Sequence, residues 1–244
     1  MPKSSNQIST VPQATKLSDQ NARIMDFSKP IECEVVVIGA GMAGLAASIL
    51  LQGAGLRVLC VEPEPFPHNR VGESLDWAAP KLLKELGILR EQLIDDRVAT
   101  YKRKITVSVL GSPSFVGVFP PWAAKKPFEF EITTLHADRL ELDQRLFEKA
   151  QEAGVEFLWE RVSSISTDGE QVISCSTVQG NQIVANWYMD ASGQARLLSK
   201  TFGIPKDVYG QRKIAIWTYL RNSTDLQGTT FYVKNSPKYF DWIW

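Results

Sequence analysis

The stretch Val35-Val36-Val37-Ile38-Gly39-Ala40-Gly41-Met42-Ala43-Gly44 decides the fold of this chain. Its four consecutive β-branched residues are typical of a strand that is buried on both faces of a parallel sheet. A Gly-x-Gly-x-x-Gly pattern follows directly, and apolar residues with helical spacing come next: Leu45, Ile49 and Leu50. The stretch therefore predicts a strand, a tight turn and a helix.

A second buried strand follows the helix and completes a β-α-β unit over residues 32–62. Gly53 and Gly55 end the helix, and the strand from Arg57 ends in an acid, Glu62, 18 residues beyond Gly44. A carboxylate at that place can accept hydrogen bonds from both ribose hydroxyls of an adenosine and would repel a 2′-phosphate. The unit predicts a dinucleotide site that disfavours NADP, and it does not by itself separate NAD from FAD.

Each glycine of the pattern has a physical reason. Gly39 permits the tight turn, Gly41 lets the backbone approach a pyrophosphate, and Gly44 lets helix and strand pack closely. The first helical residues, Met42 and Ala43, present free N–H groups and a partial positive charge to the phosphates. The alternative is that the glycines serve turning and packing alone.

Composition excludes several classes of function. The chain of 244 residues carries 27 basic and 27 acidic side chains, and this balance argues against a strongly basic nucleic-acid binder. No stretch approaches the roughly 18 apolar residues of a membrane span, and the polar N-terminus lacks a signal core. No metal site is expected, because the few candidate ligands have no metal-binding spacing: Cys33, Cys60, Cys175, His68 and His136. The cysteines are expected to be reduced, which indicates a cytoplasmic protein.

The rest of the chain divides into a leader and two interleaved regions. Residues 1–30 are polar and predict a flexible leader. Pro80 is placed in the first turn of a helix, and Asp138 begins another as its cap, with Glu141 completing a capping box. Further strands are expected at 155–159 and 183–189 with two hairpins between them, and antiparallel strands at 105–109, at 128–132 and between 213 and 244.

Four segments of residues 32–244 resemble the flavin-dependent monooxygenase and halogenase superfamily. They are the strand-glycine stretch with Glu62, Arg70-Val71-Gly72-Glu73-Ser74 with the leucine-rich helix after it, Asp138-Arg139-Leu140-Glu141-Leu142-Asp143, and Met189-Asp190-Ala191-Ser192-Gly193. The resemblance implies an α/β fold with FAD as the cofactor. A Rossmann-like FAD-binding domain, residues 31–100 and 136–203, would be interleaved with an antiparallel β substrate domain, residues 101–135 and 204–244.

The resemblance also implies roles for particular residues. Gly72 and Ser74 would lie close to the flavin, and Arg139 would contact the FAD phosphate and ribose region as a forked cation. Asp190 would bind hydroxyl groups, and Gly193 would leave room for the cofactor. Two alternatives stay open: Arg139 as a solvated arginine in a first helical turn, and the Asp-Ala-Ser-Gly segment as a simple strand-to-helix turn.

Two features point to the halogenases within this superfamily. Halogenases that act on tryptophan place a lysine in the helix after the Gly-Glu loop, and Lys81 falls near that place. A surface lysine is the alternative, and Glu73 is the second candidate for a catalytic group. The chain ends in Trp242-Ile243-Trp244, which is similar to a Trp-x-Trp motif of the halogenases.

The predicted function is that of an FAD-dependent monooxygenase or halogenase, acting on a small organic substrate through a flavin hydroperoxide. A separate flavin reductase is a possible partner. The alternatives are an FAD-dependent reductase of a prenyl or lipid chain and a truncated, non-catalytic FAD-binding fragment. Because the family places a second Gly-Asp segment well beyond this length, we expect the chain to be C-terminally truncated.

Overall fold

The computed structural model describes most of the chain from residue 29 onwards. The described residues are 29–65, 68, 70–76, 78–102, 104–110, 115–117, 134–209, 216–218, 228–235 and 240–243. Three predictions fall outside them: nearly all of the leader at 1–30, the strand at 128–132, and Trp244.

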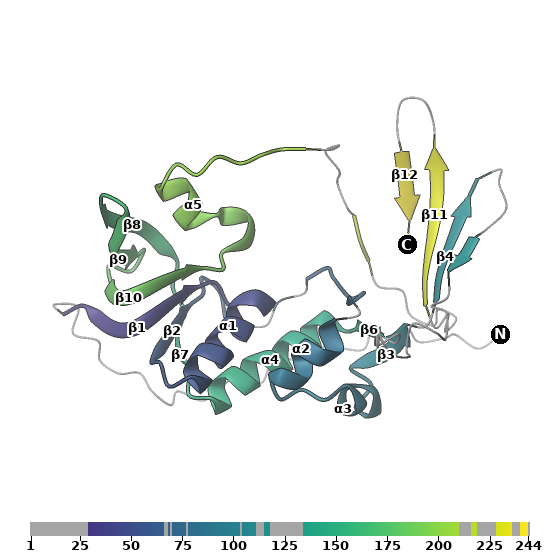
Figure 1. Ribbon diagram of the computed structural model, residues 1–244, viewed down its shortest axis with the longest axis horizontal. Helices are drawn as coiled ribbons and strands as arrows, with labels where there is room; N and C mark the ends of the chain where they lie inside the picture. The colour runs from purple at the N-terminus through teal and green to yellow at the C-terminus, as the bar shows by residue number, and fades with distance from the viewer. Residues whose placement is uncertain are drawn as a thin grey trace, which may run out of the picture.

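A six-stranded sheet forms the larger part of the molecule (Figure 1), in the order β7-β2-β1-β10-β9-β8. Its first four strands are parallel, and β9 and β8 continue it as antiparallel strands. The strands are β1 (Ile31–Ile38), β2 (Val58–Val61), β7 (Glu156–Leu158), β8 (Val162–Asp168), β9 (Gln171–Thr177) and β10 (Gln182–Asp190). The predicted α/β fold is confirmed, and both predicted hairpins belong to this sheet.

The β-branched strand is buried on both faces, as its sequence predicts. Val35 and Val37 pack with two helices that lie side by side on one face, α1 (Met42–Gly53) and α4 (Arg139–Glu152). Val36 on the other face packs with β8 and β9 residues, among them Cys175. Burial of such a side chain contributes about 1.5–3 kcal/mol relative to exposure, so this strand anchors both layers.

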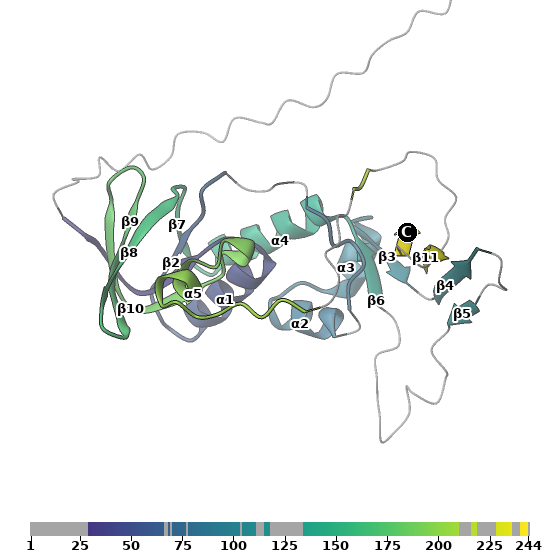
Figure 2. The same ribbon diagram turned by 90° about the horizontal axis from the view of Figure 1, so that it is seen from above.

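A second β region lies at the end of the molecule opposite the β8–β9 hairpin (Figure 2). It holds a two-stranded sheet, β3 (Ala99–Lys102) with β6 (Thr134–Ala137), and a four-stranded sheet. That second sheet has the order β12-β11-β4-β5, with β4 (Lys104–Val109), β5 (Phe115–Gly117), β11 (Gly228–Asn235) and β12 (Phe240–Ile243).

One strand pair departs from the antiparallel expectation. β4 and β11 pair in parallel, with Ile105 opposite Thr229, whereas the neighbouring pairs are antiparallel. Alternating side chains are common to both kinds of pairing, so the sequence pattern cannot set the strand direction. A parallel pair needs a long crossover connection, and the chain between these two strands, which includes β7 to β10, provides one.

The predicted helices begin where the sequence places them, but three short helical segments were not predicted. Pro80 lies in the first turn of α2 (Ala79–Glu85). The short helices α3 (Arg90–Asp95) and α5 (Leu197–Thr201) and the 3₁₀ turn Gly193–Ala195 were not predicted, because six or fewer residues carry little periodic signal.

Asp138 caps α4 as predicted, but the capping box is only half formed. Its carboxylate accepts from the N–H of Leu140 at 2.9 Å and of Glu141 at 3.3 Å. The N–H of Asp138 donates to Val98 O at 2.8 Å instead of the Glu141 side chain.

We expect Asp138→Ala to lower the free energy of unfolding by about 1 kcal/mol, measured by urea denaturation, whereas Glu141→Ala changes it far less.

Within the described part of the chain, no helix is long and apolar enough to cross a membrane. The same residues contain no cluster of three or more His, Cys, Asp or Glu side chains that could hold a metal ion.

Candidate functional site

Two glycines of the loop after β1 are required by packing. Gly39 adopts φ 110°, and a Cβ there would lie 2.5 Å from Ala191 O at the end of β10. A Cβ on Gly44 would lie 1.8 Å from Gly39 O. The loop and the first turn of α1 therefore contact each other closely, as the Gly-x-Gly-x-x-Gly pattern predicts.

Gly41 is different, because space rather than packing surrounds it. The nearest described atom to a Cβ there would be Arg70 Nη1, at 3.1 Å. Among the residues that the structure describes, no side chain caps the N-terminus of α1, and the first turn of α1 holds no acidic residue. A free helix N-terminus beside an open backbone and a cation fits a pyrophosphate. The loop residues thus suit a dinucleotide cofactor.

The two residues after Gly41 contribute through their backbone. Met42 is half-buried and its side chain packs against the core, while Ala43 is exposed. Their N–H groups, at the first turn of α1, are what the predicted phosphate contact would use.

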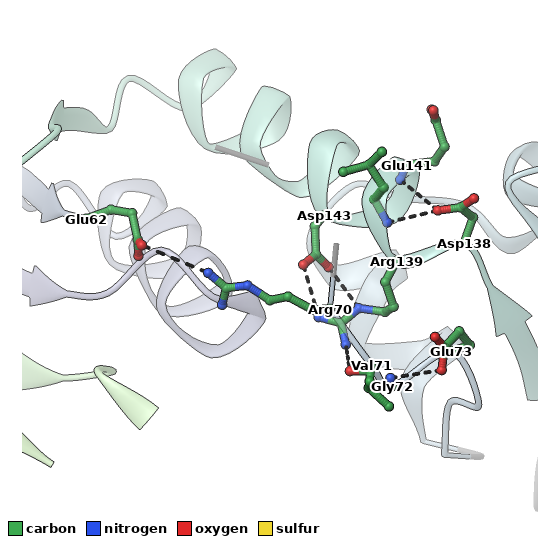
Figure 3. Close-up of polar contacts among 10 residues, drawn as sticks. Glu62, Arg70, Val71, Gly72, Glu73, Asp138, Arg139, Glu141 and Asp143 are labelled. Carbon is green, nitrogen blue, oxygen red and sulfur yellow. Dashed lines mark hydrogen bonds and ion pairs between the residues drawn. The ribbon is translucent and has the colours of Figure 1, made fainter. Parts of the chain in front are cut away.

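Glu62 is buried at the end of β2 and supports the same loop. One carboxylate oxygen accepts a hydrogen bond from Ala40 N at 2.6 Å, and the other lies 3.9 Å from Arg70 Nη2 (Figure 3). Arg70 therefore extends from Glu62 to the space above Gly41. No role was predicted for Arg70 from the sequence, and its place two residues before Gly72 was the only signal.

Arg139 is buried at the start of α4, so its interpretation as a solvated arginine is wrong. Its Nε and Nη2 donate to the two oxygens of Asp143, each at 3.0 Å, and Nη1 donates to Val71 O at 2.9 Å (Figure 3). Asp143 is fully buried. The guanidinium therefore holds the Val71-Gly72 backbone against α4, and its contact with FAD stays a prediction.

The Gly72-Glu73-Ser74 loop is fixed on both sides. Gly72 has φ 126°, and a Cβ there would lie 2.5 Å from Arg139 Nη1. Glu73 is half-buried, and its carboxylate accepts from Gly72 N at 3.0 Å while its carbonyl accepts from Ala137 N at 2.8 Å. The loop is thus held between Arg139 of α4 on one side and β6 on the other.

Asp190 and Gly193 form the turn after β10. The Asp190 carboxylate accepts from Ser192 Oγ at 2.5 Å, from Ser192 N at 3.1 Å and from Leu198 N at 2.9 Å. Burial acts to raise the pKa of Asp190, but these hydrogen bonds outweigh it and hold the pKa below its usual range. The carboxylate organises the strand-to-helix turn, and its predicted contact with hydroxyl groups stays a prediction.

The candidate halogenase residues lie on two other elements. Lys81 is exposed on α2. Trp242 and Ile243 belong to β12. The site that the structure brings together is therefore the loop at Gly41 with Glu62, Arg70 and the Arg139-held segment.

A family model described as FAD binding domain matches residues 32–240. The chain is 33% identical over 188 residues to a 1H-pyrrole-2-carbonyl-[peptidyl-carrier protein] brominase of Pseudoalteromonas luteoviolacea, covering 76% of this chain and 42% of the brominase. It is 26% identical over 214 residues to the flavin-dependent halogenase armH1 of Armillaria mellea, covering 80% of this chain and 38% of that enzyme. The chain spans less than half the length of these curated relatives.

Solved structures agree with these relatives. The flavin-dependent brominase Bmp2 superimposes with a TM-score of 0.64 at 26% identity, covering 86% of this chain and 52% of that chain. The myxobacterial chondrochloren halogenase CndH superimposes with a TM-score of 0.65 at 22% identity, covering 87% of this chain and 50% of that chain, which supports the fold. The chain therefore belongs to the FAD binding domain family, and its cofactor is FAD, as the sequence predicts.

Proposed function

We propose that this chain is the FAD-binding part of a flavin-dependent oxidoreductase of the halogenase or monooxygenase type that acts on a small organic substrate. The observation that carries the proposal is the open backbone at Gly41, which faces Arg70 at the free N-terminus of α1. The matched brominase and halogenase support the choice of reaction class. The division into residues 31–100 with 136–203 and residues 101–135 with 204–244 stays a prediction.

The roles of the residues follow from their contacts. The N–H groups at the start of α1 would bind the FAD pyrophosphate, and Arg70 would add a cation beside it. Glu62 would bind the adenosine ribose with the carboxylate oxygen that does not hold Ala40 N. Arg139 would position the Gly72-Glu73-Ser74 loop through its bond to Val71 O. The bound FAD supplies the redox chemistry, and the protein supplies position and electrostatics.

The substrate proposal rests on the relatives' names. The brominase of Pseudoalteromonas luteoviolacea and a chlorinase of Pseudomonas fluorescens both act on a pyrrole carried by a peptidyl-carrier protein. We propose a substrate of the same chemical class, a small electron-rich ring that is free or attached to a carrier. A separate flavin reductase would supply reduced FAD.

The test is an FAD titration followed by a product assay. We expect saturable FAD binding to the purified chain, read from flavin fluorescence. With an external source of reduced FAD, oxygen, bromide and a pyrrole, we expect a brominated product. Oxygenated product without bromide would indicate a monooxygenase, and a reduced prenyl chain the alternative reductase. FAD binding without any product would favour the non-catalytic fragment, and no FAD binding would refute the proposal.

Lys81 provides a test of the halogenase branch. If Lys81 is catalytic, Lys81→Met lowers the rate of bromide-dependent product formation by about 100-fold or more, the usual scale for a positioned proton-transfer group, and leaves FAD affinity unchanged. Lys84→Met is the matched control, because Lys84 is also exposed on α2. Equal rates for both variants would make Lys81 a surface lysine.

A further inference from the structure

One edge of β10 is open over most of its length. β1 pairs with nearly the whole of β10 on one side, whereas β9 pairs with residues 182–183 alone on the other. Tyr188 lies where β9 separates from β10, because its hydroxyl accepts from Ala185 N at 2.9 Å and donates to Ile173 O at 3.0 Å. Residues 184–190 therefore have no described strand beside them on that side, and we call them the open edge.

The hydrogen bonds at the end of β10 show which backbone groups face this open edge. Ala191 N donates to Ile38 O at 2.9 Å, so this N–H points toward β1. Backbone groups alternate in direction along a strand, so those of Met189 also point toward β1, and those of Tyr188 and Asp190 point away. Tyr188 thus presents a backbone donor and an acceptor to the open edge, where a further strand can meet them.

The open edge also carries two exposed apolar side chains. Trp187 is 70% exposed and Met189 is 39% exposed, and they share one face of β10 because they are two residues apart. Their partners in β1, Val35 and Val37, are buried. Trp187 and Met189 therefore continue the buried apolar layer of the sheet out to its edge, where both side chains contact solvent.

The other edges of the large sheet are protected against pairing. β7 has three residues, and β8 contains two register shifts, which bend an edge strand and interrupt its ladder. The open edge pairs with β1 in regular register and contains no lysine, arginine or proline. Its one charged side chain, Asp190, is held by the turn that follows β10. An uninterrupted edge of this kind is a template for pairing with another chain.

We propose that the open edge of β10 pairs with the open edge of a second copy of this chain, antiparallel and centred on Tyr188. The outward backbone groups of the two Tyr188 residues then form a hydrogen-bonded pair. Trp187 lies opposite Met189 of the second copy in the closer, non-hydrogen-bonded kind of pair, and the two-fold axis repeats this contact. Asp190 lies opposite Asn186, so no like charges face each other.

This self-complementarity is the reason for choosing a second copy as the partner. A two-fold contact requires a patch that matches itself after rotation, and Trp187 with Met189 does so, because a thioether packs favourably against an aromatic ring. Each tryptophan can remove about 150–250 Å² from water, so the interface is at the small end of specific ones. We therefore expect a weak dimer, with a dissociation constant on the order of 10 μM.

Sedimentation velocity tests the proposal from about tenfold below to about tenfold above that concentration. We expect the wild type to change from monomer to dimer over this range. Trp187→Lys, which places a charge on the edge at an exposed position, should stay monomeric throughout. Leu82→Lys is the matched control, because Leu82 is 56% exposed on α2, and it should dimerise as the wild type does. Thermal melting shows whether both variants fold.

Hydrogen exchange locates the contact and identifies other occupants of the edge. The Tyr188 amide should exchange about fourfold more slowly at the highest concentration than at the lowest, because about a fifth of the chain remains monomeric there. Equal protection at both concentrations would mean that a segment of the same chain covers the edge, and the proposal would be wrong. A wild type that stays monomeric, or Trp187→Lys that dimerises normally, would also overturn it. FAD is absent throughout, so the result does not depend on the proposed function.

Discussion

We expect that replacing Gly41 with valine abolishes FAD binding and leaves the fold intact. Among the described atoms, the Cβ of Gly41→Val would meet only Arg70 Nη1, the far end of a long side chain, so the backbone need not move. The added methyl groups would nevertheless fill the space above the N-terminus of α1. Each hydrogen bond lost to a charged phosphate is worth about 1.5–3 kcal/mol, so loss of two or more weakens binding by about 100-fold or beyond. Flavin fluorescence measures the affinity, and thermal melting measures the fold.

Two other glycines provide controls for this prediction. Gly53 ends α1, and no described atom lies within 4 Å of the Cβ that alanine would add there, so Gly53→Ala should bind FAD as the wild type does. Gly44→Ala should instead lower the melting temperature sharply, because its Cβ would lie 1.8 Å from Gly39 O. An unchanged FAD affinity in Gly41→Val would contradict the assignment of the phosphate loop.

We expect removal of Asp143 to destabilise the protein by about 3–5 kcal/mol, the cost of leaving a buried charge unpaired. Asp143→Ala removes the two carboxylate oxygens that accept from the Arg139 guanidinium, and Arg139 is only 8% exposed. The same change should loosen Val71 O and therefore weaken FAD binding. Urea denaturation gives the free energy of unfolding, and the FAD titration gives the second effect.

Two control variants test whether the effect of Asp143→Ala comes from the buried pair and not from any loss of charge. Arg145 Nη2 and Asp96 Oδ2 lie 2.7 Å apart at the surface. Asp96→Ala should therefore lower the free energy of unfolding by less than about 1 kcal/mol. The double variant Arg139→Met with Asp143→Leu should be more stable than Asp143→Ala, because no buried charge is left unpaired. If Asp143→Ala and Asp96→Ala cost the same, Arg139 is not held as described.

The β-α-β unit could be predicted because its signals are local. The buried run Val35 to Ile38 and the glycines at 39, 41 and 44 specify strand, turn and helix within a few residues. Arg139 and Asp143 also carried a local signal that the sequence-based prediction left unused, since a spacing of four places them on one helical face. The pair explains why a cation is stable in the first turn of α4, where the helix dipole opposes it.

Other parts of the site depend on contacts between distant residues. Arg70 lies beside both Glu62 and Gly41, and no periodic pattern in the sequence encodes these contacts. The direction of β11 beside β4 likewise involves strands far apart in the sequence, and no local pattern encodes it. The half-formed capping box has a similar cause. Asp138 N donates to Val98 O, which is distant in the sequence, and not to the neighbouring Glu141 side chain.

The parallel pairing of β4 with β11 has a consequence for biosynthesis. Residues 104–109 leave the ribosome long before residues 228–233, and strands β7 to β10 of the larger sheet are made between them. Non-local pairs of this kind require closure of a long loop and form slowly. During that interval β4 exposes an unpaired edge, which invites pairing with other chains. Translation speed and chaperone access are therefore expected to affect the yield of the second β region.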